Sequence, residues 1–282
     1  MIDGDCVQPL RAEFIGRFSS GDSKEPYRLL PFSVPPGTRR LEVRFTFERS
    51  GGSVLDLGLF DPRGHQFGRA EGFRGWSGSA RHHVIITENA ATPGYLPGPL
   101  YPGTWHVLLG LYKIAPQGCP YRVEVESSPH PGAPPAQPPP APVEAPPPGP
   151  GWYKGDLQAH THHSDADCSV AEVAAAAGRR NLDFLAITDH NTVSHHPYLA
   201  GCPRPALVPG LEVTTYRGHA NVWGAGPWLD FRCRRPEEMA QVMDAAHAQG
   251  RLVSINHPKP GGPDWEFGWD LPFDALEVWH SV

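Results

Sequence analysis

The sequence has few cysteines, no long apolar run and no excess of basic residues. Its five cysteines are odd in number and include no C-x-x-C pair, which argues against a disulfide framework and against a cysteine-based zinc site. No basic segment followed by an apolar core opens the chain, and a run of ~18 apolar residues is missing throughout. We therefore expect a cytoplasmic protein with no membrane partner.

Basic residues are scarce in the half of the chain that carries most of the histidine motifs. Residues 152–282 contain 10 Lys and Arg against 16 Asp and Glu. General nucleic-acid binding is not expected, because contacts with phosphate backbones need clustered Lys and Arg. Bound divalent metal ions would offset the acidic charge locally.

Proline, in contrast, is abundant and concentrated. Twelve of the 22 residues from Pro129 to Pro150 are proline, and Glu144 is the only charged residue among them. Proline at this density excludes helices and central strands and favours a semi-rigid polyproline II spacer. The sequence thus predicts a linker over 129–151 between a domain at 1–128 and a domain at 152–282.

Alternating apolar and polar residues dominate the first domain. The runs Leu41–Phe47, Val54–Phe60 and Tyr121–Glu126 have the period of half-buried strands, and Pro- and Gly-rich turn signals separate them. This pattern predicts an all-β accessory domain, either a sandwich or a jelly roll. We assign it no chemistry, although a carbohydrate- or protein-binding role in this domain stays open.

In the second domain, strand and helix patterns alternate. Ser169 and Glu172 form a capping box ahead of an Ala-rich helix that runs to Arg180, and Pro236 opens a second helix that runs to about Gln249. Each helix leads into a short apolar strand, Phe184–Ile187 or Leu252–Ile255. The alternation favours an α/β barrel with a site at the carboxyl ends of its strands.

Histidines and carboxylates follow these apolar runs in a fixed order. The candidate ligands are His160, Asp165, His190, Glu212, His219 and His257. Each also has a purely structural interpretation, such as a hydrogen-bonded core histidine for His160, a turn residue for Asp165 or a salt-bridged glutamate for Glu212. A glutamate in so apolar a stretch must nevertheless be paired or metal-bound.

Five blocks carry the motifs. They are 156–165 (DLQAHTHHSD), 188–190 (TDH), 209–212 (PGLE), 218–219 (GH) and 256–258 (NHP). In this order they resemble the PHP (polymerase and histidinol phosphatase) family of metal-dependent hydrolases, over about 152–282. The likeness is greatest to the carbaryl-hydrolase-like subgroup, whose members also carry a β-rich N-terminal domain. The resemblance implies a distorted (β/α) barrel, here incomplete at its C-terminus.

The resemblance also implies the roles of the ligands. His160 and Glu212 would hold a first metal; Glu212, His219 and His257 a second; and Asp165 with His190 a third. Two or three divalent ions (Mn, Zn, Fe or Mg) would make the attacking hydroxide, so no protein nucleophile is required. The small-molecule substrate would be a phosphate ester, with Lys259 near its anionic group.

Two departures from the family pattern keep alternatives open. Gln158 stands where the family has the first histidine of a His-x-His pair, and its neutral amide suits Mg or Mn better than Zn. The family's last Asp and His ligands have no counterpart before Val282, so we expect a truncated chain. These departures favour a metal-binding protein without turnover as one alternative, and the likeness to the carbaryl-hydrolase-like subgroup favours carbamate or ester hydrolysis as another. The loop histidines 162, 163, 195 and 196 are expected to face solvent or substrate, and Glu277 to support the site.

Overall fold

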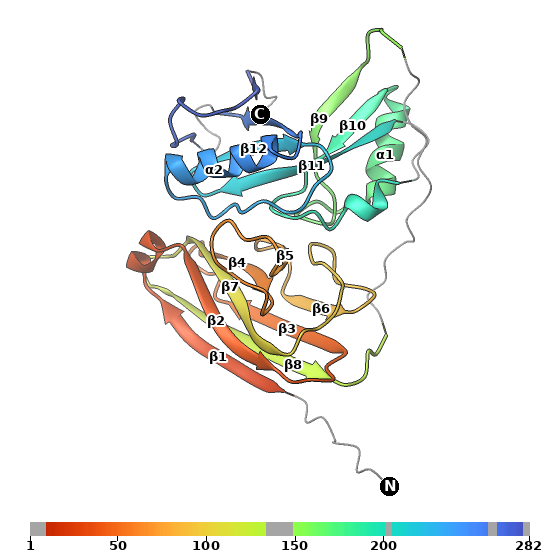
Figure 1. Ribbon diagram of the computed structural model, residues 1–282. Helices are drawn as coiled ribbons and strands as arrows, with labels where there is room; N and C mark the ends of the chain where they lie inside the picture. The colour runs from red at the N-terminus through yellow and green to blue at the C-terminus, as the bar shows by residue number, and fades with distance from the viewer. Residues whose placement is uncertain (1–9, 134–148, 201–204, 259–263, 279–282) are drawn as a thin grey trace. The chain divides into compact units, whose positions relative to one another are not determined.

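The computed structural model describes residues 10–133, 149–200, 205–258 and 264–278 (Figure 1). The chain divides into two compact units. Unit 1 comprises residues 1–65 and 71–137, and unit 2 comprises 66–70 and 138–282. Most of the predicted linker lies outside the described residues, so its predicted conformation stays a prediction.

Unit 1 is built from two four-stranded sheets. One has the strand order β1-β8-β3-β6 and the other β2-β7-β4-β5, and neighbouring strands are antiparallel in both. The strands are β1 (Arg11–Phe18), β2 (Tyr27–Val34), β3 (Arg40–Phe47), β4 (Val54–Phe60), β5 (Phe73–Trp76), β6 (His83–Thr87), β7 (Gly103–Lys113) and β8 (Cys119–Ser128); a short 3-10 turn, η1, spans Ser20–Lys24.

The core of unit 1 follows from the two-residue period of its strands. In β3, Leu41, Val43 and Phe45 are at most 1% exposed, whereas Arg44 between them is exposed. Side chains from both sheets join one apolar cluster that also includes Trp105. Burying each such large side chain contributes about 1.5–3 kcal/mol, so the alternation is sufficient to specify which face of each strand turns inward.

Unit 2 contains one six-stranded mixed sheet with the order β14-β13-β12-β11-β10-β9. Its elements are β9 (Gly155–Ala159), α1 (Val170–Arg179), β10 (Phe184–Ile187), η2 (His196–Tyr198), β11 (Ala206–Thr215), β12 (Gly218–Trp223), α2 (Pro236–His247), β13 (Leu252–Asn256) and β14 (Ala275–Leu276). Strands β9, β10 and β11 are parallel, and β12 is antiparallel to both β11 and β13.

The expected fold class, with an α/β barrel in the second half, is wrong. The regular secondary structure of the described residues is mostly β-strand, in three sheets, and their only α-helices are α1 and α2. Just two residues connect β11 to β12, which forces an antiparallel hairpin because a parallel pair needs a long crossover. Within the described ranges, β9 and β14 each pair with one neighbour, so this sheet is open.

The two predicted helices are confirmed. Ser169 Oγ accepts a hydrogen bond from the Glu172 amide, and the Glu172 carboxylate accepts one from the Ser169 amide, which fixes the start of α1. Helix α2 begins at Pro236 and ends two residues before the predicted Gln249. Helix α1 packs against β10 and α2 against β13. Neither helix has the length and apolarity that crossing a membrane requires, within the residues described; the cytoplasmic location stays a prediction.

Candidate metal centre

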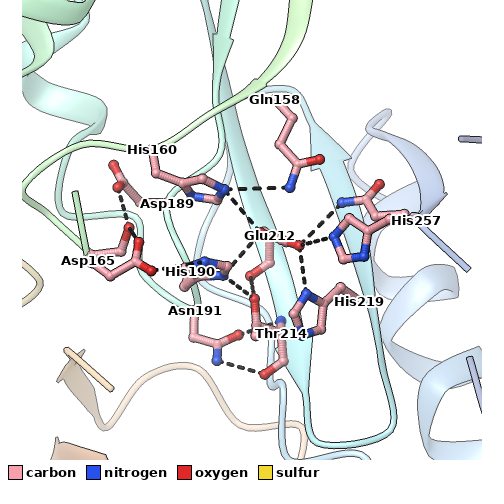
Figure 2. Close-up of polar contacts among 12 residues, drawn as sticks. Gln158, His160, Asp165, Asp189, His190, Asn191, Glu212, Thr214, His219 and His257 are labelled. Atoms are coloured by element: carbon pink, nitrogen blue, oxygen red, sulfur yellow. Dashed lines mark hydrogen bonds and ion pairs between the residues drawn. The ribbon is translucent and has the colours of Figure 1, made fainter. Parts of the chain in front are cut away.

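Four histidines and one glutamate meet at one rim of the sheet in unit 2 (Figure 2). His160 directly follows β9, His190 lies just beyond β10, and His257 directly follows β13. Because β12 runs in the opposite direction, its second residue, His219, reaches the same rim, paired with Thr214 of β11. The antiparallel hairpin that excludes a barrel therefore also delivers a histidine to the site.

Glu212 of β11 lies at the centre of this cluster and is fully buried. Its Oε1 lies 3.0 Å from His219 Nδ1 and 3.4 Å from His257 Nε2. Its Oε2 lies 3.0 Å from His190 Nδ1 and 3.4 Å from His160 Nε2. Each carboxylate oxygen thus faces two imidazoles.

The electrostatics of the cluster keep Glu212 ionised. Burial opposes its ionisation, but the charge of His190 and hydrogen bonds from His190, His219 and His257 outweigh burial, so the pKa of Glu212 lies well below its usual range. Burial also disfavours charge on His190, yet the adjacent carboxylates, Glu212 first, raise the pKa of His190 to about 9. Burial and then the charge of His190 lower the pKa of His160. Protonation of one ring therefore suppresses protonation of the other.

Two groups of side chains in this cluster could hold a metal ion. One consists of His160, His190 and Glu212, the other of Glu212, His219 and His257, and within each group the ligand atoms lie within 4.8 Å of one another. Four imidazoles around one carboxylate are a donor set that fits divalent metal, because an imidazole nitrogen without its proton offers a lone pair to the ion. Glu212 belongs to both groups.

The remaining predicted site residues lie further out. Asp165 has a largely exposed side chain with Oδ2 3.7 Å from His190 Nε2, on the side of that ring away from Glu212. Gln158 places its amide nitrogen 3.5 Å from His160 Nε2, at the edge of the first group. Glu277 accepts a hydrogen bond of 2.6 Å from the His257 amide, and so fixes the backbone of a candidate ligand. Lys259 lies outside the described residues.

A second polar network, centred on Asp189, lies next to the candidate ligands. Asp189 is fully buried and accepts hydrogen bonds from the Thr161 amide, the Thr161 hydroxyl and the Ser164 hydroxyl, at 2.7, 2.7 and 2.6 Å. His195 Nδ1 lies 3.1 Å from its Oδ2. Asp189 thereby ties the loop after His160 to the end of β10.

The expectation that the loop histidines face solvent or substrate is wrong for His163 and His195, which are 1% and 0% exposed. His163 pairs with the Ser194 hydroxyl at 2.8 Å, and His195 Nε2 lies 3.2 Å from the Ile187 carbonyl. Their burial depends on loop packing, which a search for ligand motifs does not detect.

Sequence reasoning assigned no role in the site to Asn191, Thr214 or Asn256, all close to the candidate ligands. Asn256 Nδ2 lies 3.4 Å from Glu212 Oε1, and Thr214 Oγ1 lies 2.5 Å from His190 Nδ1. The only sequence signal was position, since Asn191 and Asn256 are adjacent to motif histidines.

Comparisons with known proteins add little to this geometry. No protein-family model matches the chain, and no curated protein matches it. Among solved structures, it is similar to a periplasmic inhibitor of g-type lysozyme from Aeromonas hydrophila, at 13% identity with a TM-score of 0.24, over 42% of this chain and 86% of that one. The PHP resemblance therefore stays a hypothesis carried by the motifs, and the α/β barrel that it implied is overturned by the sheet topology.

Proposed function

We propose that this chain is a metal-dependent hydrolase whose centre holds two divalent ions, one on each side of Glu212. The observation that carries the proposal is the arrangement of one buried carboxylate with two imidazoles at each of its oxygens. A buried ionised glutamate needs cationic partners; in the metal-free protein His190 supplies this charge, and two bound cations would replace it.

The chain's own residues have distinct tasks in this proposal. His160 and His190 hold the first ion, and His219 and His257 hold the second. Bound divalent ions would supply Lewis acidity and lower the pKa of a water molecule to near neutrality. Such mixed nitrogen and oxygen donors suit Zn, Fe or Mn better than Mg.

An ester of a small molecule is the proposed substrate class. Phosphate esters come first, because two cations beside a mostly acidic unit would attract and neutralise an anionic group. Carbamate or carboxylic esters are the alternative, since the same Lewis acidity polarises a carbonyl oxygen.

The test combines metal content with turnover in the full chain. After loading with Mn, Zn, Fe or Mg and gentle desalting, elemental analysis should give about two equivalents, and the loaded protein should hydrolyse members of a panel of phosphomonoesters, carbamates and carboxylic esters. His83→Gln, which alters an exposed histidine of unit 1, is the matched control and should retain both ions. Less than about a tenth of an equivalent would contradict the proposal.

A metal-binding protein without turnover is the second candidate. Gln158 favours it, because a neutral amide beside His160 is a weaker ligand than a third imidazole would be. Full metal occupancy with no turnover on any substrate of the panel would support this candidate over the hydrolase.

A further inference from the structure

Asn191, next to the candidate ligand His190, is held in an unusual backbone conformation. Its φ is +56°, in the left-handed region that few residues other than glycine and asparagine adopt readily. Its side chain is almost completely buried. Such a conformation at an asparagine persists only where the surroundings determine it, and it often marks a functional site.

The buried amide of Asn191 acts like a peptide group in a sheet. Its Oδ1 accepts a hydrogen bond of 2.7 Å from the Thr214 amide, and its Nδ2 donates one of 2.8 Å to the Thr214 carbonyl (Figure 2). Both polar backbone groups of Thr214 are therefore satisfied by one side chain. Strand β10 ends at Ile187, but backbone pairing with β11 extends to Asn191, whose amide bonds the Glu212 carbonyl, and the side-chain amide of Asn191 continues this pairing to Thr214.

The backbone of Asn191 is pinned as firmly as its side chain. Its amide donates to the Glu212 carbonyl at 2.9 Å, and its carbonyl accepts from Trp228 Nε1 at 3.0 Å. Together with the bridge between His190 and Glu212, these bonds fix His190 opposite Glu212.

Thr214 connects this clamp to the imidazole. Its Oγ1 lies 2.5 Å from His190 Nδ1, and the same nitrogen lies 3.0 Å from Glu212 Oε2. The amide of Asn191 sets the position of the Thr214 backbone, and the Thr214 hydroxyl in turn restricts rotation of the His190 ring. Because Thr214 Oγ1 and Glu212 Oε2 both face Nδ1, the nitrogen of His190 left for a metal ion is Nε2, on the side facing Asp165.

We propose that Asn191 is a positioning residue that acts through Thr214 to hold His190 in the geometry needed by the metal position of His160, His190 and Glu212. The inference rests on the proposed metal centre and deepens it. Residues that orient metal ligands typically change metal affinity by about 10–100-fold when altered. His219 of the second position lies opposite Thr214 in the hairpin, but the hydrogen bonds of the clamp end on His190, Thr214 and Glu212 rather than on the imidazoles of His219 and His257, so this position should be less affected.

A first experiment tests the clamp without metal. Asn191→Gly keeps the positive φ at little steric cost and removes only the amide, so exchange of the Thr214 amide hydrogen, followed by NMR in the metal-free full chain, should accelerate at least about tenfold. Amides in β13, such as that of Ile255, should exchange as in the parent. Unchanged exchange at Thr214 would overturn the clamp, whether or not the protein binds metal.

A second experiment tests the effect on the ligand. Titration with Mn or Co, followed by calorimetry and Co absorption, should show the first position of Asn191→Gly weakened about 10–100-fold and the second position within about threefold of the parent. Thr214→Val, which lacks the hydroxyl, should weaken the first position to a similar extent. Thr214→Ser, which keeps the hydroxyl, should have the metal affinity and the Co absorption of the parent.

Equal weakening at both positions would mean that the substitution loosens the unit as a whole and would overturn the inference. So would a defect in Thr214→Ser equal to that in Thr214→Val. If the parent binds no metal, the proposed function is wrong and so is the metal role of Asn191, while accelerated exchange at Thr214 would still establish the clamp itself.

Discussion

The two units each bury a carboxylate, but they compensate its charge in different ways. In unit 1, Asp61 is paired with Arg63 at 2.7 Å and with the buried Arg74 at 3.4 Å. In unit 2, Glu212 is surrounded by imidazoles. Arginine keeps its proton at every physiological pH and has no lone pair to offer, whereas an imidazole can give up its proton to a competing metal ion and become a ligand. A buried acid therefore stabilises the fold in unit 1 and presents a candidate cation site in unit 2.

The largest effect is expected from removing the charge of each of the two buried carboxylates. Glu212→Gln keeps the shape but removes the charge shared by both metal groups, so both ions should be lost in elemental analysis and calorimetry. Asp61→Asn is the matched control in unit 1. It should keep metal binding and lower the free energy of unfolding by about 3–5 kcal/mol, because Arg74 is left buried without its carboxylate.

The opposite result, metal retained in Glu212→Gln and lost in Asp61→Asn, would show that the acid of unit 2 is structural. Circular dichroism of both variants separates loss of ligands from loss of fold.

A second effect concerns pH. In the metal-free protein the pKa of His190 is raised to about 9, so a metal ion at the first position must displace a proton. Affinity there should rise about tenfold per pH unit from pH 7 to 9 and level off above.

The free energy of unfolding of the metal-free protein changes with pH in the opposite direction. Because the folded pKa exceeds the unfolded value of 6.5, the stability that His190 contributes is complete below about pH 6.5 and is lost as pH rises through about 9.

Calorimetry in buffers of different ionisation enthalpy measures the released proton. His190→Gln, which cannot carry the proton, should abolish the release at the first position and the decline in metal-free stability over the same range. A proton release that is identical in this variant would place the titrating group elsewhere.

The smallest effect is expected at Gln158 and distinguishes the two metal positions of unit 2. Gln158→His would place an imidazole beside His160, at the first metal position only. Affinity for Zn at that position should increase about tenfold, or 1.4 kcal/mol, with less change for Mn, while the second position stays as in the parent. Gln158→Leu, of similar size and without a donor, controls for packing. Equal Zn affinity in all three proteins would show that this side chain does not reach the metal.

Local signals in the sequence were enough for the elements of the fold. The capping box at Ser169 and the proline at 236 predicted where two helices begin, because caps act within one turn. The alternation in 41–47 predicted a strand and its buried face. The barrel was wrong because strand direction depends on pairing and connection length, and the strand 218–223 was read only as a Gly-His motif.

For the candidate site, the sequence by itself determined the types of ligand and their places at the ends of apolar runs. Only the tertiary structure decided that Glu212 stands between four histidines, that Asp165 lies at the edge and that His163 and His195 are buried. It alone revealed Asn191, whose partner Thr214 is 23 positions away in the chain. Residue chemistry and short-range period are local properties, but distances between strands are set by sheet order and register, which depend on the packing of the whole unit.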